Sequence, residues 1–211
     1  MFTNCSTDIP MGYTLLQAHL IMRHGDRAPT TNIYLAPNNQ INGKTAESKA
    51  TAEHSYWNSQ MPSMVTLRAL STMFPVTFLE KNNNAAATKL GEKKDYPFGM
   101  LTRRGLSGTY SLGKELRKIY VDQARLLPST NTCNADVISA RSTSMNRTVE
   151  SCQSVLHGFC KPTSLSRNKD GAIIGTVNVH VETGQEQTMP NFGKYYSRDI
   201  IYFFSNKTIY Q

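Results

Sequence analysis

An apolar run from Leu15 to Met22 ends abruptly in the charged stretch Arg23-His24-Gly25-Asp26-Arg27-Ala28-Pro29. This pattern is typical of a buried strand whose C-terminal end opens into a loop. Tyr13 to Met22 is nearly all apolar, which predicts a central strand of the sheet. His19 interrupts this run, and we expect it to be a hydrogen-bonded histidine of the core. Ligands of open α/β sheets bind at such strand ends, so this stretch constrains both fold and site.

The side chains of this loop suit a phosphate group. Arg23 and Arg27 carry planar, permanently charged guanidinium groups that match phosphate oxygens. Gly25 lets the backbone approach a ligand closely, and Pro29 stiffens the exit of the loop. His24 stands between the two arginines, where a neutral imidazole can attack a phosphorus atom whose oxygens the arginines hold. The alternative is a strand end with solvated charges, which does not account for this ordered set.

A second strand is predicted over Ala135 to Ala140, and it also ends in an arginine, in Arg141-Ser142-Thr143. A helix is predicted to follow, with an apolar stripe of Val149, Cys152, Leu156 and Phe159. The start of a helix offers free N–H groups and partial positive charge, both of which favour an anion.

The chain between these two blocks is more varied. Thr30 to Gln60 is polar without a sustained period, and we expect a long loop over the active site. Met61 to Leu79 has helical apolar spacing broken by Pro75. Glu80 to Lys94 is low in complexity and is expected to be a solvated loop.

Three further elements are expected. Gly105 to Val121 is predicted to be an amphipathic helix with Thr102 as its N-cap, although Gly108 and Gly113 weaken that prediction. Its apolar stripe is Leu106, Tyr110, Leu116, Ile119 and Tyr120. Thr176 to Val181 reads as a strand in which His180 is structural, and Ile200 to Phe204 as an edge strand or a poorly packed tail.

The set from Arg23 to Pro29 resembles the RHGxRxP signature of the histidine acid phosphatases, the second branch of the histidine phosphatase superfamily. Leu101-Thr102-Arg103-Arg104-Gly105 resembles the start of a structural helix of that family. Arg141-Ser142-Thr143, followed by Arg147-Thr148, resembles its Arg-Ser-Thr block. The resemblance is strong over 19–29, 98–120 and 135–159 and is absent after about residue 190.

The resemblance implies an α/β fold with a mostly parallel sheet flanked by helices, incomplete at the C-terminus. It implies hydrolysis of phosphomonoesters through a phosphohistidine on His24. Arg23, Arg27 and Arg141 would bind the phosphate, and Arg147 would buttress the pocket or brace the fold. No metal or cofactor is implied. The expected partners are phosphorylated small molecules, sugars or glycans.

The sequence departs from the family in one respect. The family's leaving group takes its proton from a His-Asp pair far downstream, and no histidine among these 211 residues precedes an aspartate. Asp26 is a candidate substitute acid. An alternative function is therefore that of a truncated or pseudo-phosphatase that binds phosphorylated ligands with little turnover. A mutase of the same superfamily is a third reading, but Arg27-Ala28-Pro29 and the Arg141 block favour the phosphatase branch.

The composition narrows the partners and the compartment. The net charge of +8 suits phosphate substrates, and no long Lys/Arg block indicates nucleic-acid binding. Four cysteines without a C-x-x-C motif argue against zinc and allow two disulfides. The even number of cysteines and the glycosylation sequons at Asn4, Asn146 and Asn206 together favour the secretory pathway. The family resemblance implies a lysosomal or extracellular location. No signal peptide and no membrane span is visible.

The expected organisation is an irregular lead-in over residues 1–12, a partial histidine phosphatase domain over 13–190 and an unassigned tail over 191–211. The domain is long enough to bury a core of its own.

Overall fold

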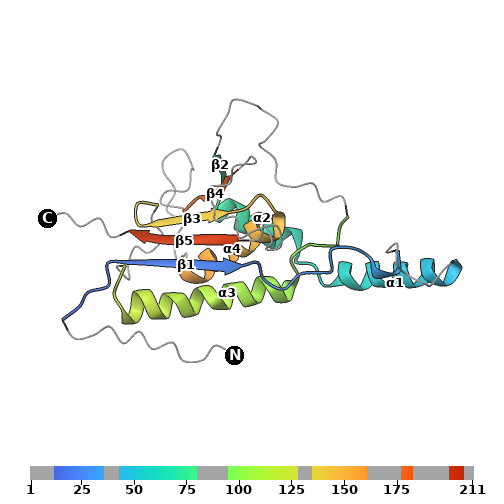
Figure 1. Ribbon diagram of the computed structural model, residues 1–211, viewed down its shortest axis with the longest axis horizontal. Helices are drawn as coiled ribbons and strands as arrows, with labels where there is room; N and C mark the ends of the chain where they lie inside the picture. The colour runs from blue at the N-terminus through green and yellow to red at the C-terminus, as the bar shows by residue number, and fades with distance from the viewer. Residues whose placement is uncertain are drawn as a thin grey trace, which may run out of the picture.

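The computed structural model describes residues 12–35, 43–79, 95–127, 135–160, 177–182 and 200–206 (Figure 1). The elements are, in chain order, β1 (Gln17–Arg23), η1 (Ile33–Leu35), α1 (Lys44–Ser59), α2 (Met64–Met73), β2 (Val76–Leu79), α3 (Arg103–Arg117), η3 (Lys118–Gln123), β3 (Ile138–Ser142), α4 (Asn146–Cys160), β4 (Val179–Glu182) and β5 (Ile200–Asn206). The loop predicted over 80–94 lies outside the described residues.

The strands form one sheet in the order β1-β5-β3-β4-β2. β3 pairs with β4, and β4 with β2, in parallel. β5 is antiparallel to both of its neighbours, β1 and β3. Four of the five strands therefore run in one direction, and the expected α/β class with a mostly parallel sheet is confirmed (Figure 1).

β1 lies at an edge of the described sheet, so the prediction of a central strand is wrong. Its residues alternate between exposed and half-buried, and the side chain of Ile21 is 56% exposed. His19 falls on the exposed face, so it is not the core histidine that we expected. The apolar run misled because Ala18, Leu20 and Met22 are only half-buried, while the residues that alternate with them in β1 are exposed.

β5 lies in the interior of the sheet, which corrects the prediction of an edge strand or a tail. All seven of its residues pair with β1, and five of them pair with β3. Ile200 to Phe204 is rich in β-branched and aromatic residues, which suit a strand flanked on both sides. Sequence reasoning recognised the strand but had no signal for its neighbours.

The core lies between the sheet and α4. Val149, Cys152 and Leu156 of α4 are buried, and Phe159 is partly buried, which confirms the predicted apolar stripe. They join a cluster that includes sheet residues Ile138, Ala140, Val179 and Val181. Cys152 is a free thiol and Cys160 is disulfide-bonded, so the four cysteines do not form the two disulfides that their number allows. Burial strongly raises the pKa of that thiol and keeps it protonated.

α3 packs closely against α4 at Gly113 and at Gly158 of α4, and the predicted apolar stripe is borne out only in part, since Leu116 is buried. Tyr110 of that stripe is 38% exposed, whereas Gly105, Thr109 and Gly113 are buried. A Cβ added at Gly113 would lie 2.1 Å from the carbonyl oxygen of Val155. Gly113, one of the two glycines that weakened the helix prediction, is thus what lets the two backbones touch, whereas nothing lies within 4 Å of a Cβ added at Gly108. Thr102 is the N-cap of α3, as predicted.

Residues 30–60 are not one long loop. They contain η1 and the 16-residue helix α1, which lies to one side of the sheet (Figure 1). Only Ala46 and Ala50 of α1 are buried, so the helix lacks the apolar stripe by which a helix is recognised. α2 confirms the helical spacing before Pro75, and the chain continues beyond that proline as β2.

Candidate functional site

His24 follows the last residue of β1. Its Nδ1 lies 2.5 Å from the carbonyl oxygen of Gly25. A carbonyl oxygen can only accept a hydrogen bond, so this contact places the proton on Nδ1. In a neutral imidazole the lone pair is then on Nε2, which is a buried atom here. The loop thus fixes the tautomer in which Nε2 is the nucleophilic nitrogen.

Gly25 is held between two helices. Its backbone N–H donates a hydrogen bond of 3.0 Å to Oγ of Ser151 in α4, and that hydroxyl donates one of 2.7 Å to the carbonyl of Arg147. On the other side, a Cβ added at Gly25 would lie 2.6 Å from the carbonyl oxygen of Gly105 in α3. Close packing against α3 is therefore a second reason for a glycine at this position.

Asp26 is bound to the start of α3. Oγ1 of Thr102 donates to the Asp26 carboxylate at 2.7 Å, and the Thr102 N–H donates to the Asp26 carbonyl at 3.0 Å. The same Oγ1 accepts from the N–H of Gly105 at 3.0 Å and so caps the helix. A negative charge at a helix N-terminus is stabilising. These contacts favour a structural role for the carboxylate over that of a proton donor.

Arg27 lies in a short antiparallel pairing of the loop with residues 99–101. Arg27 forms a bridge with Leu101, and the N–H of Ala28 donates to the carbonyl of Met100 at 3.0 Å. Nη1 of Arg27 donates to the carbonyl of Ala28 at 2.9 Å. Ala28 and Leu101 are fully buried, so this part of the loop is anchored in the protein.

Arg147 reaches the same region from the first turn of α4. Its Nη1 donates to the carbonyl of Gly99 at 3.4 Å, and the N–H of Gly99 donates to the carbonyl of Pro29 at 2.6 Å. Gly99 has a φ of 70°, a conformation that favours glycine. These contacts support the expected role of Arg147 as a brace.

Arg141 lies within β3, not after it, because the strand begins and ends later than predicted. It is level with His180 on β4 and, across β5, with Ile21 on β1. Residues in register share a face of the sheet, and alternation puts Arg23 on that face too. One strand separates β1 from β3, so the two backbones are about 10 Å apart. The topology thus brings the two arginines to one face of the sheet.

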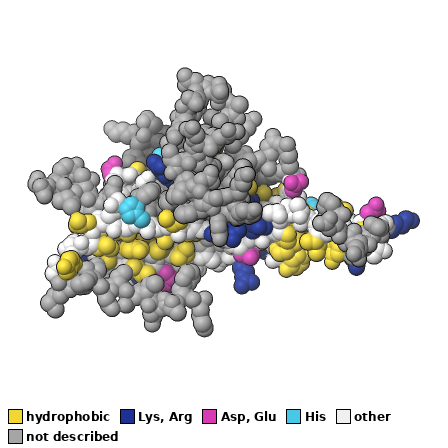
Figure 2. All heavy atoms as spheres, viewed as in Figure 1, with side chains coloured by type: hydrophobic (Ala, Val, Ile, Leu, Met, Phe, Trp, Pro, Cys, Tyr) yellow, Lys and Arg dark blue, Asp and Glu magenta, His cyan; other side chains and the backbone are white. Residues whose placement is uncertain are grey.

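This face is opposite to the one that α4 covers, since Ile138 and Ala140 point into the core and Arg141 is only half-buried. Figure 2 shows Lys and Arg side chains gathered near the middle of the view, where β1 ends in Figure 1. Arg23, which lies on this face, directly precedes His24, so the end of β1 places a positive charge next to the candidate nucleophile in the chain.

His180 lies beside Arg141 in the sheet. It is half-buried, and its Nδ1 is buried without a hydrogen-bond partner among the residues that the structure describes. Burial lowers the pKa of His180, and the guanidinium of neighbouring Arg141 lowers it further. A neutral imidazole thus lies beside the arginine. Sequence reasoning missed this pairing and the contact of Ser151, because neither residue belongs to a motif that indicates it.

Comparisons with known proteins concern the family of the chain. Residues 14–195 match the family model of the histidine phosphatase superfamily (branch 2). The chain is 30% identical to rat 2-phosphoxylose phosphatase 1 over 156 residues, which is 71% of this chain and 29% of that protein. It is 35% identical to Counting factor 60 of Dictyostelium discoideum over 95 residues, 44% of this chain and 22% of that protein. The matches thus span less than a third of the length of these relatives.

Neither a metal site nor a membrane-spanning helix is found among the described residues. Among the described residues, no three His, Cys, Asp or Glu side chains lie close enough together to hold a metal ion. No helix in the described ranges is both long and apolar enough to cross a membrane.

Proposed function

The chain belongs to branch 2 of the histidine phosphatase superfamily, and on that premise we propose that it hydrolyses phosphomonoesters through a phosphohistidine on His24. The observation that carries the proposal is the contact between Nδ1 of His24 and the carbonyl of Gly25. It leaves the lone pair on Nε2, at the end of a strand and between two arginines.

The reaction has two steps. Nε2 of His24 attacks the phosphorus atom, the bond from phosphorus to the ester oxygen breaks, and the alcohol leaves with a proton. Water then attacks the phosphohistidine, which releases phosphate and restores the neutral imidazole. Arg23, Arg27 and Arg141 stabilise the charge on the phosphate oxygens in both steps. This electrostatic contribution must be large, because uncatalysed phosphomonoester hydrolysis is among the slowest reactions known.

The rate of the proposed hydrolysis depends on which group donates a proton to the leaving alcohol. The five histidines of these 211 residues are followed by Leu, Gly, Ser, Gly and Val, so no His-Asp pair is present in them. Asp26 is the candidate substitute, but its carboxylate accepts a hydrogen bond from Thr102. Loss of a general acid typically slows a reaction by about 10² to 10⁴. The second candidate function is therefore binding of phosphorylated ligands with little turnover.

The proposed substrates are small phosphorylated molecules, with phosphorylated sugars or glycans first among them. The name of the 2-phosphoxylose phosphatases, to which this chain is similar, supports that choice. We further propose a place in the secretory pathway, in lysosomes or outside the cell. Asn146 begins α4 and is buried, so a glycan on the folded protein would have to be on another sequon.

The test is turnover of an aryl phosphate at acid pH by the purified chain, beside His24→Ala and Arg141→Ala. Turnover that both substitutions abolish supports the hydrolase. Binding of vanadate that depends on Arg141, without turnover, supports the second candidate. Turnover that persists in His24→Ala would contradict a phosphohistidine mechanism.

A further inference from the structure

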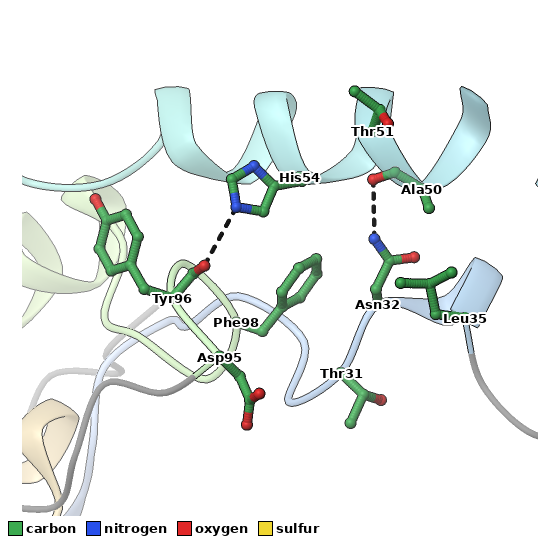
Figure 3. A pocket seen from close by; sticks show the side chains of 9 residues that line it. All are labelled: Thr31, Asn32, Leu35, Ala50, Thr51, His54, Asp95, Tyr96 and Phe98. Atoms are coloured by element: carbon green, nitrogen blue, oxygen red, sulfur yellow. Dashed lines mark hydrogen bonds between the residues drawn. The ribbon is translucent and has the colours of Figure 1, made fainter. Parts of the chain in front are cut away.

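A cleft of about 690 Å³ opens beside the candidate phosphate loop (Figure 3). One wall is a face of α1, with Ala50, Thr51 and His54. The opposite wall comes from residues 31–35 and from the turn at 95–98. Cavities of about 300 to 1,000 Å³ are the usual size for binding small organic molecules.

The cleft begins where the phosphate loop ends. Thr31 of one wall follows Pro29 by two residues, and Phe98 of the other precedes Gly99, which donates to the carbonyl of Pro29 at 2.6 Å. The same Pro29 closes the segment that starts at His24. The cleft therefore adjoins the C-terminal end of the segment that starts at His24.

Hydrogen bonds across the cleft hold its walls in place. Nδ2 of Asn32 donates to the carbonyl of Ala50 at 2.9 Å, and Nε2 of His54 is 3.2 Å from the carbonyl of Tyr96 (Figure 3). These contacts join α1 to both segments of the opposite wall. The space is thus already shaped, and a ligand would not have to order it.

The chemistry of the lining favours an uncharged ring. Phe98, Tyr96 and Leu35 offer aromatic and aliphatic surface, and Asp95 is the carboxylate among the described lining residues. None of these lining residues is Lys or Arg. The cation closest by sequence, Lys49, lies over the ring of Tyr34 at 5.8 Å. Among the described lining residues, a second phosphate in the cleft would meet a carboxylate and no cation, which is unfavourable.

We propose that this cleft binds the organic part of the substrate, and that it selects an uncharged ring carrying a single phosphate over a ligand with several phosphates. This proposal rests on the proposed function, which places the phosphate of the substrate at His24. It adds the chemical class of the leaving group, an uncharged ring. A ring in the cleft would pack its face against the apolar lining that Phe98 and Leu35 provide.

The test measures binding of the ring separately from binding of the phosphate. The probe is phenyl β-glucoside, an uncharged ring compound without phosphate, and its Kd for the full chain is measured by NMR titration. Thr51→Lys adds a cation to the cleft at an exposed position of α1, and Val65→Lys adds the same charge to α2, outside the cleft. We expect Thr51→Lys to raise the Kd at least about tenfold and Val65→Lys to change it less than about twofold, because only the first obstructs the apolar cleft. A thermal melt checks that both variants fold.

Charge selection is tested with esters that carry one or two phosphates on the same sugar ring. The wild type is expected to bind the singly phosphorylated sugar more tightly, and Thr51→Lys to narrow or reverse that preference. Absence of glucoside binding, or equal effects of the two lysines, would overturn the cleft proposal. Inorganic phosphate binding that depends on Arg141 would leave the proposed function standing in that case. Conversely, glucoside binding without any phosphate binding would support the cleft alone.

Discussion

The backbone N–H of Gly25 donates a hydrogen bond of 3.0 Å to Oγ of Ser151. The hydroxyl in turn donates to the carbonyl of Arg147, and Ser151 is fully buried. A loop that follows β1 is thereby joined to the helix that follows the strand of Arg141. The candidate nucleophile and the second arginine block, more than a hundred residues apart in sequence, are parts of one packed unit.

Ser151→Ala tests this connection. It leaves the buried Gly25 N–H without its acceptor, so we expect the free energy of unfolding to fall by about 1 to 3 kcal/mol. Phosphate affinity is also expected to fall, because His24 neighbours Gly25. Urea unfolding and phosphate titration measure both effects.

The matched control is Ser154→Ala on the same helix. Its hydroxyl donates to the carbonyl of Leu106 in α3, away from the His24 loop. This variant is expected to keep its phosphate affinity. Equal loss of affinity in both variants would show that Ser151 has no special link to the site.

Gly105→Ala and Gly108→Ala are expected to have opposite effects. A Cβ at Gly105 would lie 2.1 Å from the carbonyl oxygen of Asp26, whereas nothing lies within 4 Å of one at Gly108. Gly105→Ala should lower the free energy of unfolding by about 1 to 3 kcal/mol through overpacking. Gly108→Ala should raise it by up to about 1 kcal/mol through helix propensity. Chemical denaturation of both variants checks the pair, and a neutral Gly105→Ala would contradict the close contact of loop and helix.

The His180 imidazole reports on Arg141. Burial and the Arg141 guanidinium lower the pKa of His180 below its ordinary value of 6.5. Arg141→Met removes the second cause, so we expect the pKa to rise towards 6.5 without reaching it. NMR titration of the histidine ring measures the change. An unchanged pKa would show that the guanidinium does not lie near His180.

The same lowered pKa predicts how stability depends on pH. The unfolded chain takes up the His180 proton first as the pH falls below about 6.5, so the free energy of unfolding falls between that pH and the folded-state pKa. Above pH 7 this group has no effect. Burial lowers the pKa of His157 and adds a contribution of the same sign. Urea midpoints across this range should vary less in His180→Gln than in the wild type, and an equal slope in both would contradict the assignment.

Asp26→Asn separates a proton donor from a structural carboxylate. The amide oxygen of asparagine can still accept from Thr102, so we expect kcat to fall less than about tenfold if the role is structural. Thr102→Val should instead lower the free energy of unfolding by about 1 kcal/mol, because it removes the cap of α3. A loss of kcat of about 10² or more in Asp26→Asn, with an unchanged melting temperature, would identify Asp26 as the acid.

The sequence predicted elements whose residues carry a local signal. The His24 loop was recognisable from its motif, and the apolar stripe of α4 from its period. α1 was missed because its residues are polar on nearly all sides, so no period marks it as a helix.

The position of an element in the sheet was less predictable. Strand order depends on contacts between segments that are distant in sequence. For that reason β1, which was predicted to be central, lies at an edge of the described sheet, and β5, which was predicted to be an edge strand or a tail, lies inside it. The contact of Ser151 with Gly25 belongs to the same class, since a serine in a helix gives no sign of what it will meet. The predicted roles of Arg23, Arg27 and Arg141 in phosphate binding stay proposals.

The most direct measurement is detection of a phosphoryl group on His24. The chain is mixed with an aryl phosphate at acid pH, quenched in alkali, in which phosphohistidine is stable, and digested for mass spectrometry. The account predicts phosphate on the His24 peptide, absent in His24→Ala and reduced in Arg141→Ala. An aryl phosphate hydrolysed at the wild-type rate by His24→Ala, or a phosphoryl group on another residue, would contradict it.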